Sequence, residues 1–183
     1  MMLHVAGACA QGMPGLRLVF ASQHGELGYT VALLRALAAS EPLSPTVFSL
    51  SVHNAAAGLL STVRADRAES TAVAAGDETL GYALLESYCQ LMQEPQRPVL
   101  IVYGDAPLPP EYQPFGTRAD ASLGRGRALA VLLSREDSRP TAVSTEAGGG
   151  EPCGEAQVDA FIRHLEQAAP VRWMGGATTW SWH

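Results

Sequence analysis

The stretch from Ser44 to Leu80 constrains the fold more than any other, because signals for a helix, a strand and a second helix follow one another closely. Ser51 is suited to cap the first helix, since its hydroxyl can accept a hydrogen bond from a free backbone N–H of the first turn. Helical spacing then places a face of mostly small residues on this helix: Val52, Ala55, Ala56, Leu59, Leu60 and Val63. This pattern predicts that another backbone packs closely against the helix.

The second half of the stretch predicts a short buried strand that turns sharply into a helix. The apolar run from Ser70 to Ala75 suits a strand, and Gly76 and Asp77 interrupt it. A helical period then restarts with Leu80, Leu84, Tyr88 and Leu91. Many α/β enzymes place a nucleophile at such a turn, where the helix N-terminus stabilises negative charge. Here valine and alanine precede the turn, so it has the architecture of a nucleophile elbow without a nucleophile.

Strand and helix signals alternate along the rest of the chain. Strands are predicted at 16–21, 98–104 and 127–134, with another at 140–145 beside the last, and the run at 98–104 is typical of a strand buried on both faces. Helices are predicted at 2–11, after the turn at 22–25, and near the C-terminus. The last two carry apolar stripes of Leu27, Val31, Leu34 and Leu37, and of Val158, Phe161, Ile162 and Leu165. The alternation predicts an α/β fold with a mostly parallel mixed sheet covered by helices.

The composition restricts the class of protein. A chain of 183 residues is expected to form a single domain over 1–183, with an irregular Pro/Gly-rich segment at 105–127 and a flexible link at 146–154. A net charge of -6 without a basic run argues against nucleic acid, and no apolar run approaches the roughly 20 residues of a membrane helix. The absence of lysine excludes a Schiff-base or P-loop lysine mechanism. Three cysteines without metal-like spacing predict a reduced, cytoplasmic protein without a metal site or cofactor.

Two segments carry a resemblance to a known family. Phe48-Ser-Leu-Ser-Val-His-Asn-Ala55 and Ser70-Thr-Ala-Val-Ala-Ala-Gly76 resemble the N-terminal half of the β-ketoacyl synthases, which have the thiolase fold. The chain is more closely similar to the short synthase-like proteins of aryl-polyene and related type II fatty-acid or polyketide clusters. The resemblance extends from Leu16 to Asp105 and implies half of a thiolase-like fold, here without the usual N-terminal strand.

The resemblance implies a subunit that does not catalyse by itself. In active ketosynthases the reactive cysteine stands where this chain has Val73, and the catalytic histidines lie in a C-terminal half that this chain is too short to contain. A chain-length-factor-like role follows, in which the chain pairs with a full-length β-ketoacyl-acyl carrier protein synthase, shapes its acyl pocket and meets acyl carrier protein only indirectly. The residues implied at the partner and pocket face are Phe48, Val52, His53, Asn54, Ala56, Leu59 and Val73.

Two other functions remain open from the residues themselves. A stand-alone small hydrolase would use His24 with Glu26 or Asp105, since a His-carboxylate couple after a strand can act as a general base. A degenerate homodimer would bind acyl chains or carrier protein without a ketosynthase.

Other distinctive residues have ordinary structural interpretations. His53 and Asn54 are expected to be buried and hydrogen-bonded at a helix or subunit contact, and Cys89 to be inert core. Three tryptophans, at 173, 180 and 182, suit either packing against a partner or a sheet edge, or a ligand platform.

Overall fold

A four-stranded mixed sheet forms the centre of the molecule. The structure is a computed structural model that describes residues 1–117, 120, 126–135, 143–148 and 151–183. The strands of the central sheet are β1 (Arg17–Ala21), β2 (Ser70–Val73), β3 (Val99–Asp105) and β4 (Arg127–Leu133), in the order β2-β1-β3-β4. β1 runs parallel to β2 and β3, whereas β4 is antiparallel to β3. The predicted mostly parallel mixed sheet is confirmed.

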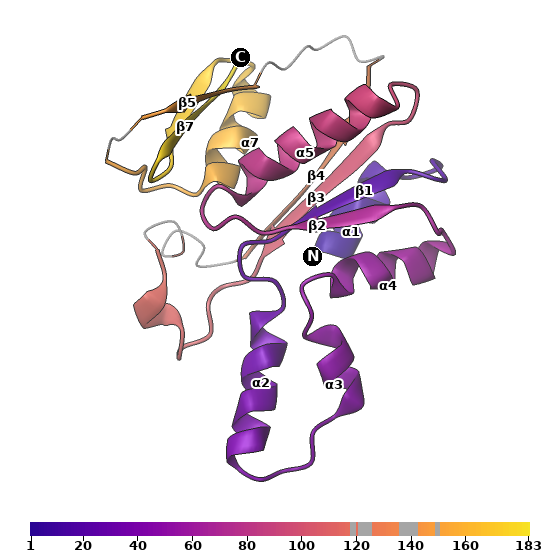
Figure 1. The fold of residues 1–183 in the computed structure, drawn as a ribbon, viewed down its shortest axis with the longest axis vertical. Coiled ribbons are helices and arrows are strands. Elements are labelled where there is room, and N and C mark those ends of the chain that lie inside the picture. Colours follow the sequence, from indigo (N-terminus) through magenta and orange to yellow (C-terminus); the bar gives the residue numbers. More distant parts are fainter. Residues whose placement is uncertain (118–119, 121–125, 136–142, 149–150) are drawn as a thin grey trace.

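Helices cover both faces of this sheet (Figure 1). Side chains alternate across a strand, so Val19 and Ile101 pack on one side while Phe20 and Leu100 pack on the other. The first side is covered by α5 (Thr79–Gln93) and α7 (Gln157–Gln167), and the second by α1 (Met2–Cys9) and α4 (Ala55–Arg64). β3 is buried along its whole length, as its continuous apolar run predicts.

The C-terminal tryptophans belong to a second, smaller sheet. Its strands are β5 (Val143–Ala147), β6 (Val171–Met174) and β7 (Thr178–Trp182), antiparallel in the order β5-β7-β6. The prediction of a strand beside 127–134 is therefore wrong for the described part of 140–145, because β5 pairs with β7. All three tryptophans are buried in the core cluster that α5 and the central sheet also form. They are core residues of this chain, so the ligand-platform interpretation is wrong.

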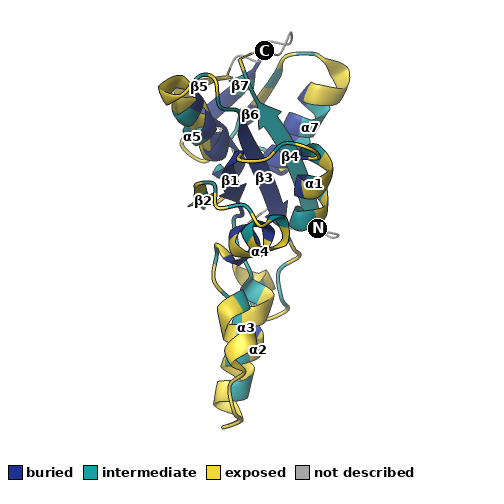
Figure 2. Ribbon diagram, turned by 90° about the vertical axis from the view of Figure 1, so that its right-hand side faces the viewer, coloured by how far each residue is buried: buried dark blue, intermediate teal, exposed yellow. Residues whose placement is uncertain are grey.

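α2 (Leu27–Ala38) and α3 (Pro45–Leu50) extend away from this body as a pair (Figures 1 and 2). The predicted apolar stripe on α2 exists, but of its members only Val31 is buried. Leu34 and Leu37 are 50% and 61% exposed. The C-terminal part of the stripe, Leu34 and Leu37, therefore forms surface within this chain. A short 3-10 helix, η1 (Gln113–Phe115), lies in the predicted irregular segment.

The helix predicted to start at Ser51 starts later. Ser44 caps α3 by accepting a bond from the Val47 N–H at 3.4 Å, and Pro45 occupies the first helical turn, where its missing N–H does no harm. Ser51 instead ends α3, with its hydroxyl donating to the Phe48 carbonyl at 2.8 Å. α4 then begins at Ala55 and buries four residues, Ala55, Ala56, Ala57 and Leu60, while Val52, Leu59 and Val63 stay exposed.

α1 confirms the predicted N-terminal helix in a shorter form. Its apolar side packs against β3 and β4 on the α4 side of the sheet.

Within the described residues, no helix has both the length and the apolar composition that crossing a bilayer requires.

Candidate functional site

The strand-to-helix turn at Gly76 has the geometry that the sequence predicts. Gly76 adopts a φ of +58°, a conformation that glycine takes without steric penalty. The Thr79 hydroxyl donates to the Gly76 carbonyl at 2.6 Å and accepts from the Ala75 N–H at 2.9 Å, which fixes the start of α5. Val73 is the last residue of β2, and its carbonyl accepts a bond from the Ser22 N–H at 3.2 Å. Its aliphatic side chain offers no nucleophile at this turn.

β2 is an edge strand, which corrects the prediction of a buried one. It lies at the end of the sheet order, with β1 as its neighbour. Its side chains alternate, with Ser70 and Ala72 exposed and Thr71 and Val73 half-buried. The outer edge of β2 has no partner strand in the described part of the chain, so its backbone groups on that side are available to another chain.

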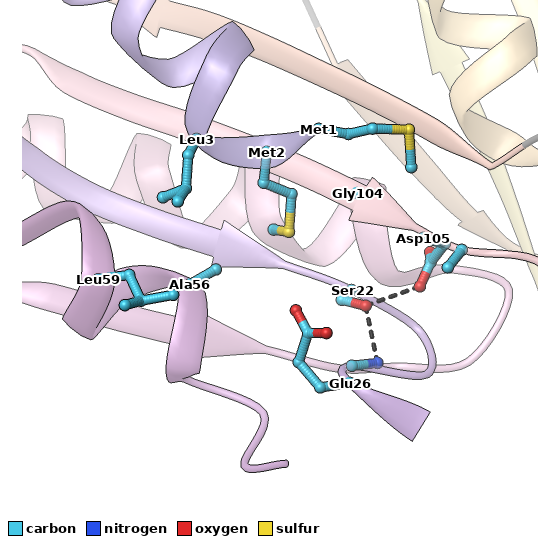
Figure 3. Close-up of a pocket in the computed structure, with 11 residues that line it drawn as sticks. Met1, Met2, Leu3, Ser22, Glu26, Ala56, Leu59, Gly104 and Asp105 are labelled. Carbon is cyan, nitrogen blue, oxygen red and sulfur yellow. Dashed lines mark hydrogen bonds between the residues drawn. The ribbon is translucent and has the colours of Figure 1, made fainter. Parts of the chain in front are cut away.

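Asp105, at the end of β3, organises the turn that follows β1. Asp105 is 2% exposed, and its carboxylate accepts bonds from the Ser22 hydroxyl at 2.7 Å and from the Gln23 and His24 N–H groups at 3.2 Å. The Ser22 hydroxyl also accepts from the Gly25 N–H at 2.8 Å (Figure 3). Burial, with the Asp105 carboxylate nearby, raises the pKa of Tyr103. These contacts assign Asp105 a role in holding the turn.

His24 does form a His-carboxylate couple, but with Asp120 and not with Glu26. The imidazole Nε2 lies 2.6 Å from Asp120 Oδ1. The second oxygen of Asp120 accepts from the Thr117 N–H at 2.6 Å. Burial raises the pKa of Asp120, but the hydrogen bonds from His24 and Thr117 outweigh it and hold that pKa below its ordinary value. Asp120 is 96 residues from His24, and no sequence signal marked it as the partner.

Glu26 lies apart from this couple. It lines a cavity of about 240 Å³ at the ends of β1 and β3, together with Asp105 and residues of α1 and α4 (Figure 3). The turn that carries Glu26 also packs on His53, whose Nε2 lies 2.8 Å from the Ser22 carbonyl oxygen. His53 is therefore hydrogen-bonded as predicted. It precedes α4, and its partner is a backbone carbonyl of the same chain, in the turn after β1. Asn54 is exposed, which contradicts its expected burial.

The residues predicted at the partner face are mostly at the surface. Phe48 is 63% exposed, and Val52 and Leu59 are also exposed, whereas Ala56 is buried. Cys89 is exposed on α5, so its prediction as core is wrong. Among the described residues, no three His, Cys, Asp or Glu side chains gather in a way that could hold a metal ion.

Comparisons with known proteins identify a family and two similar structures. A family model described as the N-terminal domain of β-ketoacyl synthases matches residues 1–183. The structure of the ketosynthase ApeO in complex with its chain length factor ApeC, from Xenorhabdus doucetiae, is similar with a TM-score of 0.87 and 24% identity, over 99% of this chain and 74% of that chain. The ishigamide ketosynthase/chain length factor is similar with a TM-score of 0.54 and 20% identity, over 84% of this chain and 47% of that one. No curated protein matches the chain.

Proposed function

The chain belongs to the family of β-ketoacyl synthase N-terminal domains, and from this premise we propose that it is a non-catalytic, chain-length-factor-like subunit. It pairs with a full-length β-ketoacyl-acyl carrier protein synthase and shapes the acyl pocket of that partner, in cytoplasmic aryl-polyene or fatty-acid-type biosynthesis. The predicted half of a thiolase-like fold is confirmed by the structural match, which supplies the scaffold for this role.

The observation that carries the proposal is the apolar surface exposed on α2, α3 and α4. Each of these consecutive helices carries large apolar side chains that are more than 40% exposed: Leu34 and Leu37 on α2, Phe48 on α3, and Leu59 and Val63 on α4. A soluble monomer rarely leaves such a set uncovered, and exposed apolar patches of this kind mark protein contacts. Figure 2 shows that α2 and α3 project from the body with little of their surface buried, which suits an arm that packs against another subunit.

The open edge of β2 is a second feature that suits contact with a partner subunit. Backbone N–H and C=O groups on an unpaired edge can hydrogen-bond a strand of another chain. Val73 lies on this strand and Phe48 on the projecting arm. We place the partner and pocket face on Phe48, Val52, His53, Asn54, Ala56, Leu59 and Val73, as the family resemblance implies.

The site chemistry gives less support to a stand-alone hydrolase. Its nucleophile would need a hydrogen bond to a basic imidazole, but the Ser22 hydroxyl bonds Asp105 and the His24 imidazole bonds Asp120. Val73 has no group that could carry an acyl chain. The proposed subunit therefore acts through contacts with its partner, and the acyl group stays on the partner's cysteine.

Native mass spectrometry of the tagged chain, purified from its own host with identification of the bound protein, tests the proposal. We expect a stoichiometric complex with a cysteine-bearing ketosynthase. Phe48→Asp places a charge on the arm and is expected to weaken this complex at least about tenfold, because a desolvated charge in an apolar contact is costly. Phe115→Asp is the matched control, because Phe115 is 81% exposed and lies on η1, outside α2, α3 and α4.

Three results would contradict the proposal. Recovery of the chain as a clean monomer would contradict pairing with a ketosynthase. A homodimer that retains acyl chains or carrier protein would favour the degenerate binder. Equal loss of the complex in Phe48→Asp and Phe115→Asp would show that the arm formed by α2 and α3 is not the specific contact. Circular dichroism of both variants checks that they remain folded.

A further inference from the structure

The arm formed by α2 and α3 is joined to the body of the molecule by two short links. The first link, residues 22–26, leads from β1 into α2, and the second link, residues 51–54, leads from α3 into α4. The two helices pack chiefly on each other. Of their residues, all of which the structure describes, only Val31 is buried. Because the arm projects from the body (Figures 1 and 2), its direction depends on how the two links are held.

The first link is fixed to the central sheet at Ser22. The Ser22 N–H donates to the Val73 carbonyl at 3.2 Å, and the hydroxyl donates to the Asp105 carboxylate at 2.7 Å. These two acceptors lie at the ends of β2 and β3, the strands on either side of β1. The hydroxyl also accepts from the Gly25 N–H at 2.8 Å. Ser22 is thus a fixed point, because its movement would break bonds to two strands.

His53 holds the second link against this fixed point. Its Nε2 lies 2.8 Å from the Ser22 carbonyl oxygen, and since a carbonyl oxygen can only accept, Nε2 carries the hydrogen and donates. The ring also lies close to Gly25, where a Cβ atom would be 3.0 Å from His53 Cδ2. A further contact across the base of the arm, from the Thr30 hydroxyl to the Ser51 carbonyl, is long at 3.5 Å. The imidazole therefore makes the better-formed contact between the two sides of the base.

Farther along α2, an exposed ion pair restrains the arm. Arg35 pairs with Glu111, and their side chains are 64% and 43% exposed. Water and salt screen such a pair, so it contributes little. His53 is half-buried, and its bond to the Ser22 carbonyl is screened less. Of these two restraints on the arm, the His53 contact is expected to be the stronger.

We propose that His53 is a positioning residue, which fixes the angle at which the arm meets the partner subunit. The inference rests on the proposed function, in which the arm packs against a ketosynthase. It gives His53 a role through the arm and not through a contact of its own with the partner. An arm that is already held in the binding orientation loses less conformational freedom on association. If release of His53 leaves that orientation populated for only part of the time, the apparent affinity falls by the same fraction.

The distance distribution between two spin labels tests the role of His53 in the free chain. One label is attached to Cys89, which is exposed on α5, and the other to Glu41→Cys, in the exposed connection between α2 and α3, after both half-buried cysteines are replaced by serine. His53→Phe keeps a ring but removes the donor, and we expect it to broaden the distribution and shift its maximum. His53→Gln supplies an N–H donor again and should restore the narrow distribution. His4→Phe, on an exposed residue of α1, is the matched control and should change nothing.

A second variant disturbs the same contact without altering His53. In Gly25→Ala, the added methyl group would press on the imidazole, and alanine would have to adopt a φ of +58°. We expect the distance distribution to broaden as in His53→Phe. Gly12→Ala is the matched control, because Gly12 has a φ of +77° but a Cβ atom there meets nothing within 4 Å. Circular dichroism of each variant checks that the chain remains folded.

The second experiment measures the affinity of the ketosynthase complex. We expect His53→Phe to weaken it about tenfold, and His53→Gln to recover it to within about twofold of the parent, since one hydrogen bond sets the arm angle. His4→Phe should leave the affinity unchanged.

Each alternative result has its own consequence. An unchanged distance distribution in both His53→Phe and Gly25→Ala overturns the inference, even if the complex forms. A broadened distribution with unchanged affinity overturns the role of the arm angle in binding the partner. Weak binding by His53→Gln despite a narrow distribution would show that the imidazole contacts the partner itself, which contradicts action through the arm. If the parent chain forms no complex, the proposed function fails, while the distance measurements still decide whether His53 fixes the arm.

Discussion

His24 and Asp120 hold the segment after β3 against the turn after β1. The His24 Nε2 contact at 2.6 Å and the two bonds from Thr117 make Asp120 a junction between parts of the chain that lie far apart in the sequence. The side chain of Asp120 is only 5% exposed, so these bonds are poorly replaced by water. His24, which the sequence offered as a catalytic base with Glu26 or Asp105, therefore pairs with Asp120 in a structural contact.

Asp120→Asn should lower the free energy of unfolding by about 1–2 kcal/mol at pH 7, because a buried charge-assisted bond is lost. The native pKa of Asp120 lies below its ordinary value of 3.8, so its contribution is complete above that value and disappears as the pH falls through the lowered native pKa. The variant should therefore lose less stability than the parent on acidification in this range. Urea unfolding at pH 7 and at lower pH values measures both effects.

The matched control is Glu111→Gln, in the same segment. Glu111 pairs with Arg35 at the surface, with both side chains more than 40% exposed. Its loss should change stability by less than about 1 kcal/mol. Equal losses of stability in the two variants would show that the buried His24–Asp120 contact contributes no more than an exposed ion pair.

Among the helices, α5 links the central sheet to the small C-terminal sheet. Its inner side packs on β1 and β3 through residues such as Leu80 and Leu84. Near its N-terminus, the Gly81 N–H donates to Gln157 Oε1 of α7 at 2.8 Å. A Cβ atom at position 81 would lie 2.7 Å from the ring of Trp180. Glycine is thus required here by a close approach and not by backbone conformation.

Gly81→Ala is expected to destabilise the chain by about 1–3 kcal/mol, because the methyl group overpacks against a buried tryptophan. Gly58→Ala on α4 is the matched control, since a Cβ atom there meets nothing within 4 Å. That control should raise stability by roughly 0.5–1 kcal/mol through helix propensity. Chemical denaturation of the two variants measures the difference, and two changes of the same sign would contradict the packing argument.

The two sheets share one hydrophobic core in the molecule as a whole. Trp173, Trp180 and Trp182 of the small sheet contact the same cluster as Val19 and Ile101 of the central sheet. α7 contributes Phe161, whose ring meets Trp182 edge-on with a centroid separation of 5.6 Å. Because neither sheet covers this cluster alone, we infer that residues 1–183 behave as a single domain.

Thermal or urea unfolding should therefore show one transition. All three tryptophans lie in the small sheet, so their fluorescence reports on that sheet, while far-ultraviolet circular dichroism is dominated by the helices. The two signals should change with the same midpoint. Separate midpoints would contradict a shared core and divide the chain into two folding units.

Local sequence determined much of the scaffold. The continuous apolar run of β3 and the Gly76 turn form the elements that their residues predict, since strand propensity and glycine's freedom at positive φ act over a few residues. The sequence alone also shows that Val73, before this turn, offers no nucleophile. Capping signals compete over equally short ranges. Ser44 and Pro45 start α3, which ends at Ser51, so the next helix begins only at Ala55.

Only the tertiary structure decided which surfaces are covered and which distant residues meet. A helical period shows that Leu34 and Leu37 share a face, but not whether another element covers them, and here both stay at least half exposed. The pairing of β5 with β7, and of His24 with Asp120, joins residues that no local pattern relates. Periodicity is set by bonds between neighbours in the sequence, whereas burial and pairing depend on contacts between residues far apart in it.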